Sequence, residues 1–343
     1  MHAGVLQLEP MQQSEITMTR VDSSKTPVLA PNPPSAPGGD QSGGQKIKRR
    51  YWTARTKRDA WIFLAFALPN IVLIAVFTYR PLIANIQYSM LDWTLGSDFA
   101  TAIGLQNYIT FFSSADAANV LGTTAIFTVF TVGGSMVLGL LIALALSQKL
   151  PGRTFARSAI FAPYVLSGVG VGLVWLFIFD PVYGVLSWVL RSLGQNSPQW
   201  INDPKLSLVM VIIVYVWKNL GYCAVVYLAG LQSMPKDVME AASLDGASAC
   251  RRFISISLPL LSPTTFFLLI TSLLSSLQAF DILKIMTPTG QGTNTLMFET
   301  YLQAFGSYNK AGYSAAISVV LFVLLLIMTV VQMRFVERKV HYA

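Results

Sequence analysis

The sequence predicts an all-α polytopic membrane protein with six transmembrane helices and a long polar connection between the fourth and the fifth. Three observations lead to this class: 53% of the 343 residues are apolar, only 12% are charged, and six apolar runs are long enough to cross a bilayer. A helix rises about 1.5 Å per residue, so about 20 residues span a hydrocarbon layer. The runs are too long for the strands of a membrane barrel and lack their alternation.

The six apolar runs are separated by polar connections that contain most of the charged residues. They cover Ala60–Tyr79, Thr123–Leu146, Ser158–Phe179, Leu206–Leu231, Thr264–Ile285 and Ala315–Val331. Pro163 lies inside the third run and predicts a kink there. Gly168 and Gly172, four residues apart in the same run, predict close packing against a neighbouring helix.

The distribution of lysine and arginine orients the chain in the membrane. If the N-terminus is cytoplasmic, the inner segments hold 18 of these residues and the outer segments hold five, including Arg80. This bias follows the positive-inside rule and predicts that both termini are cytoplasmic. The net charge of +8 is therefore a consequence of topology rather than a sign of nucleic-acid binding.

Two regions are expected along the chain, a tail over residues 1–58 and a transmembrane domain over residues 59–343. The tail is rich in proline and glycine and has little apolar content, so it cannot bury enough surface to offset its ordering entropy. Its end is a basic cluster from Lys46 to Arg58, which is typical of segments held at the cytoplasmic leaflet.

Few residues of the chain suit catalysis or metal binding. The two cysteines cannot form a disulfide framework, and the two histidines, His2 and His341, lie at opposite ends of the chain. The glycine-rich part of the tail lacks the spacing of an ATP-binding loop. An intramembrane enzyme would need paired acids or histidines inside its spans, and an ion channel would need a repeated filter segment. The sequence offers neither pattern.

The long connection between the fourth and fifth spans predicts two short helices joined by a glycine. Pro235 suits the start of the first helix, and Gly246 permits the left-handed residue that ends it. A second helix is expected to begin near Ser248, and Pro259 and Pro263 are expected to end it before the fifth span. By pattern alone this segment is either an ordinary amphipathic loop or a docking element for a partner.

This loop, residues 232–263, resembles the EAA signature of permease subunits from binding-protein-dependent ABC importers. It reads Glu240-Ala241-Ala242, then Asp245-Gly246-Ala247, then Phe253, Ile256 and Leu258-Pro259. Its place between the fourth and fifth spans also matches that family. The resemblance extends from about residue 60 to residue 343 and includes the segment Gly104–Tyr108 in the first outer connection.

The C-terminal half is similar to one group within the family, the first permease subunit of glycerol-3-phosphate importers. The similarity rests on Thr295-Leu296, Tyr301, Phe305 and the segment Thr329–Tyr342. It implies a glycerol phosphate or a glycerophosphodiester as cargo. Sugar permeases share the loop and the fold, so a sugar or an oligosaccharide is the alternative cargo.

The resemblance also implies the partners and the location of the chain. A second permease subunit, two ATPase subunits and an external solute-binding protein would complete the importer in the bacterial cytoplasmic (inner) membrane. ATP and Mg²⁺ would belong to the ATPase subunits, so this chain would bind no cofactor and would not be an enzyme. The implied ATPase-coupling residues are Glu240, Ala241, Ala242, Asp245, Gly246 and Ala247. Without a partner, the two acids would be solvated surface charges worth at most about 1 kcal/mol each.

Polar residues inside the spans are candidates for the substrate path. They are Lys218, Tyr215, Asn219, Gln278, Asp281 and Lys284. A cation inside the bilayer costs about 2.5–3.5 kcal/mol on insertion scales, so Lys218 should face protein or water. Its ammonium group is expected either to meet an anionic cargo or to serve as a cap or ion pair in the bundle, with Asp281 as the candidate partner.

Overall fold

The computed structural model describes residues 54–148, 151–290, 292–306 and 308–336. Most of the tail expected over residues 1–58 lies outside these ranges, although residues 54–58 are already helical. By its internal contacts the chain divides into Met1–Ile62 and Phe63–Ala343. The helix bundle and the sites below belong to the second unit.

The described residues are mostly helical, as expected for an all-α polytopic protein. Within the part of the chain that the structure describes, five helical segments have the length and hydropathy of a membrane span, and a bent helix pair makes a sixth if it is counted as one span. The five are Trp61–Tyr88, Ala115–Ser147, Pro204–Gln232, Ser262–Met286 and Ala311–Arg334, and the bent pair is Arg153–Val165 with Gly168–Ile178.

The first span is longer than its apolar run. Helix α1 (Ala54–Ile74) continues through a π-helical turn (Ala75–Tyr79) into α2 (Arg80–Tyr88). Arg80, expected in an outer connection, therefore lies within helical structure. The π-helical turn precedes Pro81, and this widened backbone accommodates a proline that cannot donate the usual helical N–H.

A small ribbon and a short helix follow the first span. Strand β1 (Leu91–Trp93) pairs antiparallel with β2 (Ala100–Ala102), and α3 (Gln106–Ser113) comes next. Asn107, only 8% exposed, donates from its amide to the carbonyls of Ser89 and Leu91, both at 2.9 Å. These bonds connect α3 to the end of the first span, and an asparagine suits this position because its side-chain amide can donate two hydrogen bonds.

The centre of the bundle is the long contact between α4 (Ala115–Ser147) and α8 (Pro204–Gln232). Both helices start with a side-chain cap. Ser114 accepts from the backbone N–H of Ala117 and begins α4, and Asp203 does the same for the first turn of α8. Helices α12 (Ser262–Leu277) and α15 (Ala311–Val331) also pack in the bundle, α12 against α4 and α8, and α15 against α12.

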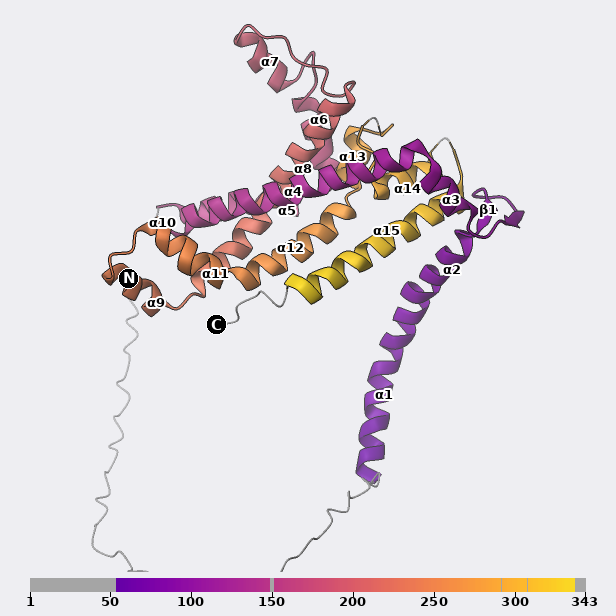
Figure 1. Ribbon diagram of the computed structural model, residues 1–343, viewed down its shortest axis with the longest axis horizontal. Coiled ribbons are helices and arrows are strands. Elements are labelled where there is room, and N and C mark those ends of the chain that lie inside the picture. Colours follow the sequence, from indigo (N-terminus) through magenta and orange to yellow (C-terminus); the bar gives the residue numbers. More distant parts are fainter. Residues whose placement is uncertain (1–53, 149–150, 291, 307, 337–343) are drawn as a thin grey trace, which may run out of the picture. The chain divides into compact units, whose positions relative to one another are not determined.

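The third span is not the single helix expected over Ser158–Phe179. Helices α5 (Arg153–Val165) and α6 (Gly168–Ile178) meet at an angle of 99°, and Figure 1 shows α6 leading away from α5. The backbone is extended at Leu166 and Ser167, which separates the two helices. The break thus follows α5 and does not lie at Pro163 itself. After α6, the short helix α7 (Val185–Ser192) precedes α8.

The fifth span is interrupted as well. Helix α12 ends at Leu277, and the short helix α13 (Asp281–Met286) begins after three non-helical residues. The packing predicted for the two glycines of the third span is present: a Cβ on Gly168 would crowd Asp281, and one on Gly172 would crowd Ile285. Helix α14 (Leu296–Phe305) precedes α15, and a π-helical turn (Gln332–Val336) follows α15.

Candidate functional site

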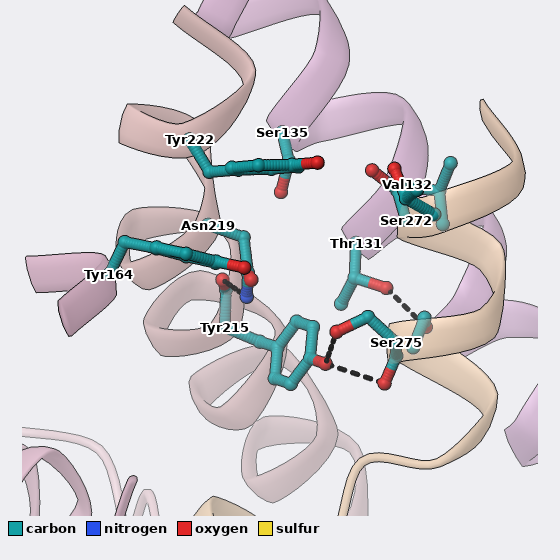
Figure 2. Close-up of a pocket in the computed structure, with 11 residues that line it drawn as sticks. Thr131, Val132, Ser135, Tyr164, Tyr215, Asn219, Tyr222, Ser272 and Ser275 are labelled. Atoms are coloured by element: carbon teal, nitrogen blue, oxygen red, sulfur yellow. Dashed lines mark hydrogen bonds between the residues drawn. The ribbon is translucent and has the colours of Figure 1, made fainter. Parts of the chain in front are cut away.

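A small polar cavity of about 60 Å³ lies inside the bundle, between α4, α5, α8 and α12. Figure 2 shows the rings of Tyr164 and Tyr222 on one side and the hydroxyl groups of Thr131, Ser272 and Ser275 on the other. The full lining is Thr131, Val132, Ser135, Tyr164, Tyr215, Asn219, Tyr222, Thr271, Ser272, Ser275 and Ser276. Every one of these side chains is uncharged, and most of them carry a hydroxyl group.

Hydrogen bonds hold the polar wall of the cavity in place. The phenol of Tyr215 donates to the carbonyl of Ser275 at 2.7 Å and lies 3.2 Å from its hydroxyl (Figure 2). Asn219 donates from its amide to the carbonyl of Tyr215 at 2.7 Å, one turn earlier in α8. The hydroxyls of Thr131 and Ser276 are 2.8 Å apart and connect α4 to α12.

The opposite wall is aromatic. The rings of Tyr164 and Tyr222 stack with centroids 4.8 Å apart and planes 16° apart. Ser135 lies nearby on α4 and is only 2% exposed, yet its hydroxyl has no hydrogen-bond partner among the described residues. A buried hydroxyl without a partner is costly, so this position favours a guest molecule that can accept or donate a hydrogen bond.

The structure brings two of the six candidate path residues to this cavity, Tyr215 and Asn219. Lys218 does not line it: its ammonium group donates to the carbonyl of Tyr164 at 2.8 Å and lies 5.4 Å from the centre of that ring. The ammonium group bonds to this helix carbonyl instead of forming an ion pair with Asp281.

The three remaining candidates lie at or beyond the break in the fifth span. Gln278 ends α12, and Asp281 begins α13 beside Gly168 of α6. The ammonium group of Lys284 lies over the ring of Tyr301, 4.5 Å from its centre. This cation–π contact offers Lys284 a partner inside the protein.

Sequence reasoning missed the hydroxyl side chains on α4 and α12. A signal was available, because Thr131 and Ser135 are four residues apart, as are Ser272 and Ser276. Such spacing places both members of a pair on one helix face. Within an apolar run, a polar stripe of this kind indicates a face turned toward protein or water.

The connection between α8 and α12 contains the two short helices expected there. Helix α9 (Lys236–Leu244) is followed by Gly246, whose φ is +74°, and then by α10 (Ala249–Arg252). The hydroxyl of Ser248 accepts from the N–H of Arg251 at 3.3 Å and starts α10. The prediction of a left-handed glycine joint is confirmed.

The expectation that two prolines end the second helix is wrong. The helical path continues from α10 through a π-helical turn (Phe253–Ser257) and α11 (Leu258–Leu260) into α12, with a turn residue only at Leu261. Pro259 follows the π-helical turn and Pro263 follows the turn at Leu261, so each proline lies where regular α-helical hydrogen bonding is already interrupted.

The surface of the glycine joint faces away from the rest of this chain. Glu240, Ala241, Asp245 and Gly246 are exposed, and Ala242 and Ala247 are half-buried. Among the described residues, a Cβ built on Gly246 would meet no atom within 4 Å. The space beside Gly246 is therefore open, and small and acidic residues are exposed around it.

Comparisons with known proteins agree with this architecture. The family described as "Binding-protein-dependent transport system inner membrane component" matches residues 135–342. Similar proteins include the sn-glycerol-3-phosphate transport system permease protein UgpA of Agrobacterium fabrum (strain C58 / ATCC 33970), 37% identical over 282 residues, which are 80% of this chain and 94% of the relative. UgpA of Rhizobium meliloti (strain 1021) is 36% identical over 284 residues, with the same shares of both chains.

A solved structure has a similar fold. It is a bacterial ABC transporter involved in the import of the acidic polysaccharide alginate, with a TM-score of 0.72 over 83% of this chain and 97% of that one, at 22% identity. The family match covers more than half of the present sequence, and the two UgpA relatives are similar over most of it. The chain therefore belongs to the binding-protein-dependent transport system inner membrane components: it is a multi-pass permease subunit of an ABC importer, without catalytic activity of its own.

Proposed function

We propose that this permease forms half of a translocation path for a glycerol phosphate or a glycerophosphodiester. The observation that carries the proposal is that relatives similar over 80% of this chain are named sn-glycerol-3-phosphate transport system permease proteins. In this proposal a second permease subunit forms the other half of the path. An external solute-binding protein delivers the cargo, and two ATPase subunits bind ATP and Mg²⁺.

The polar cavity supports a cargo that carries several hydroxyl groups. Serine, threonine and tyrosine hydroxyls both donate and accept, so they can exchange hydrogen bonds with a glyceryl group in several orientations. The hydroxyl of Ser135 at this place has no hydrogen-bond partner among the described residues, and Tyr215 and Asn219 hold their positions through bonds to the backbone. We assign this cavity to the path, with Tyr215 and Asn219 as wall residues.

The glycine joint is proposed as the contact with an ATPase subunit. Exposed Glu240 and Asp245 can face basic groups of the partner, and the open space around Gly246 permits close approach. Motion of the ATPase subunits would then reach α12, which carries the cavity hydroxyls, because the helical path from α10 to α12 is nearly continuous. In this proposal both chain termini lie on the ATPase side of the membrane.

A sugar or an oligosaccharide is the second candidate cargo. The observation that favours it is that the cavity is lined only by uncharged side chains. A phosphate monoester brings roughly 1.5–2 negative charges at neutral pH and a diester brings about one, so it calls for cationic or donor groups along the path. A neutral sugar makes no such demand.

The two cargoes are separated by uptake into proteoliposomes that contain the complete importer. Labelled glycerol-3-phosphate, a glycerophosphodiester and a disaccharide are supplied with the binding protein and ATP. Uptake of either phosphate ester supports the first proposal, and uptake of the disaccharide alone rejects it in favour of the second. Ser135→Ala should reduce uptake of the accepted cargo, whereas Ser158→Ala, an exposed serine on α5, should not.

A further inference from the structure

The break in the third span leaves two helix ends facing each other inside the membrane domain. Helix α5 ends at Val165, and α6 begins at Gly168 after two extended residues. The last carbonyls of a helix and its first N–H groups lack partners within that helix. The C-terminal end of α5 therefore carries partial negative charge, and the N-terminal end of α6 carries partial positive charge.

A cation from another helix lies at the negative end. The ammonium group of Lys218 on α8 donates to the carbonyl of Tyr164, the next-to-last residue of α5, at 2.8 Å. The same group lies 5.4 Å from the centre of the Tyr164 ring. One side chain thus binds both the backbone and the ring of the residue that forms the aromatic wall of the cavity.

An anion from a third element lies at the positive end. Asp281 is the first residue of α13, and a Cβ on Gly168 would stand 2.8 Å from the Cβ of Asp281 and 3.0 Å from its Oδ2. Four residues further along both helices, Gly172 is equally close to Ile285, at 3.0 Å from its Cβ. The two glycines let α13 lie against α6, so the carboxylate is held beside the first turn of α6.

We propose that Lys218 and Asp281 are positioning residues that stabilise the two ends of the broken third span. Each charge has the sign opposite to that of the helix end beside it. Together they hold the break open at a fixed geometry, and they keep Tyr164 stacked on Tyr222 at the wall of the cavity. This role differs from contact with an anionic cargo, and it goes beyond the proposed function because it does not depend on which cargo passes.

Uptake by the reconstituted importer tests this proposal with single and paired variants. Lys218→Met and Asp281→Asn should each lower uptake of the accepted cargo by about five-fold, in line with the contribution of a charge at a helix end. Lys218→Arg should restore most of the loss, because a guanidinium group also donates to a carbonyl. Lys205→Met, at an exposed lysine on the same helix, should leave uptake unchanged.

An exchange of the two charges gives the sharpest result. In Lys218→Asp with Asp281→Lys, each charge would face a helix end of its own sign, so the double variant should transport no better than the worse single variant. Recovery of uptake would instead show a direct ion pair and would overturn the proposal. Unchanged uptake in both Lys218→Met and Asp281→Asn would overturn it as well.

The charge of the cargo distinguishes a positioning role of Lys218 from direct contact between Lys218 and the cargo. Glycerol-3-phosphate and a glycerophosphodiester differ in charge, so a cargo-binding Lys218 should change their uptake ratio when it becomes methionine. The proposal expects an unchanged ratio, and a selective loss of the monoester would reject it.

If the wild type takes up only the disaccharide, the proposed cargo fails, yet the same variants still test the helix ends with that sugar. The amount of each variant in the membrane and its co-purification with the ATPase control for folding. If Lys218→Met does not reach the membrane, the uptake by Lys218→Arg serves as the test instead.

Discussion

Gly139 on α4 lies directly against Cys223 on α8: a Cβ on the glycine would stand 2.5 Å from the Cβ of the cysteine. The backbone nitrogen of Ala224 lies 3.0 Å from the same point. Because the nearest atoms belong to the backbone and to a Cβ, no change of rotamer can relieve the contact. Close approach at small residues is how helices associate where lipid removes the hydrophobic driving force.

Replacement of this glycine should weaken the bundle. Gly139→Ala is expected to cost about 1–3 kcal/mol of stability, the range for overpacking a tight core. Gly133→Ala is the matched control, because this glycine is exposed on the same helix and its Cβ would meet no atom within 4 Å. The measurement is thermal unfolding in detergent. Equal transition temperatures for the two variants would show that α4 and α8 accommodate a Cβ at position 139 without a loss of stability.

The glycine joint at Gly246 gives a second prediction. Gly246→Val should abolish ATP-dependent uptake while the protein remains in the membrane, because a β-branched residue strongly disfavours a positive φ. Gly246→Asn tests the space around the joint, since asparagine tolerates this backbone conformation but adds a side chain. Loss of ATPase co-purification in both variants would support close approach by the partner. Normal uptake by Gly246→Val at equal expression would remove the joint from coupling.

The proposed orientation can be tested with a native thiol. Cys250 is exposed at α10, whereas Cys223 is buried. In sealed cells, a membrane-impermeant maleimide should label Asn196→Cys in the connection between α7 and α8 but not Cys250. Permeabilised cells should show labelling at both positions, with Cys250→Ser as the control for background. Labelling of Cys250 in sealed cells would reverse the topology and separate the loop from any cytoplasmic ATPase.

The stability of the turn after α6 should decrease at low pH. The carboxylate of Asp180 accepts from the N–H groups of Tyr183 at 2.7 Å and Val182 at 2.8 Å, and these bonds lower the pKa of Asp180 below its ordinary value. The ionised form is thus favoured in the folded state. Its contribution to the stability of the turn is present above the ordinary pKa of about 4 and is lost as the pH falls through the lowered pKa.

Hydrogen exchange at two backbone amides measures this effect. Asp180→Asn should speed exchange at Val182 and Tyr183 at neutral pH, because the amide oxygen accepts without a charge. The amide of Leu193, which bonds within α7, serves as the internal reference. Identical protection in both proteins would mean that the turn does not rely on the charge of Asp180.

Local features of the sequence determined much of this protein. The number and order of the apolar runs were predictable because the bilayer sets a minimum length for any spanning helix. The joint at Gly246 was predictable because a positive φ is a property of one residue and its neighbours. The same holds for Gly168 and Gly172, whose spacing alone puts them on one face of a helix.

The tertiary structure alone decided the breaks and the cavity. An apolar run has the same composition whether the helix is straight or bent by 99°, so the end of α5 could not be found from hydropathy. Lys218 caps a carbonyl 54 residues earlier in the chain, and Thr131 meets Ser276 across 145 residues. Contacts between residues so far apart depend on how the helices pack, whereas span length and glycine geometry are set by the chain within a few residues.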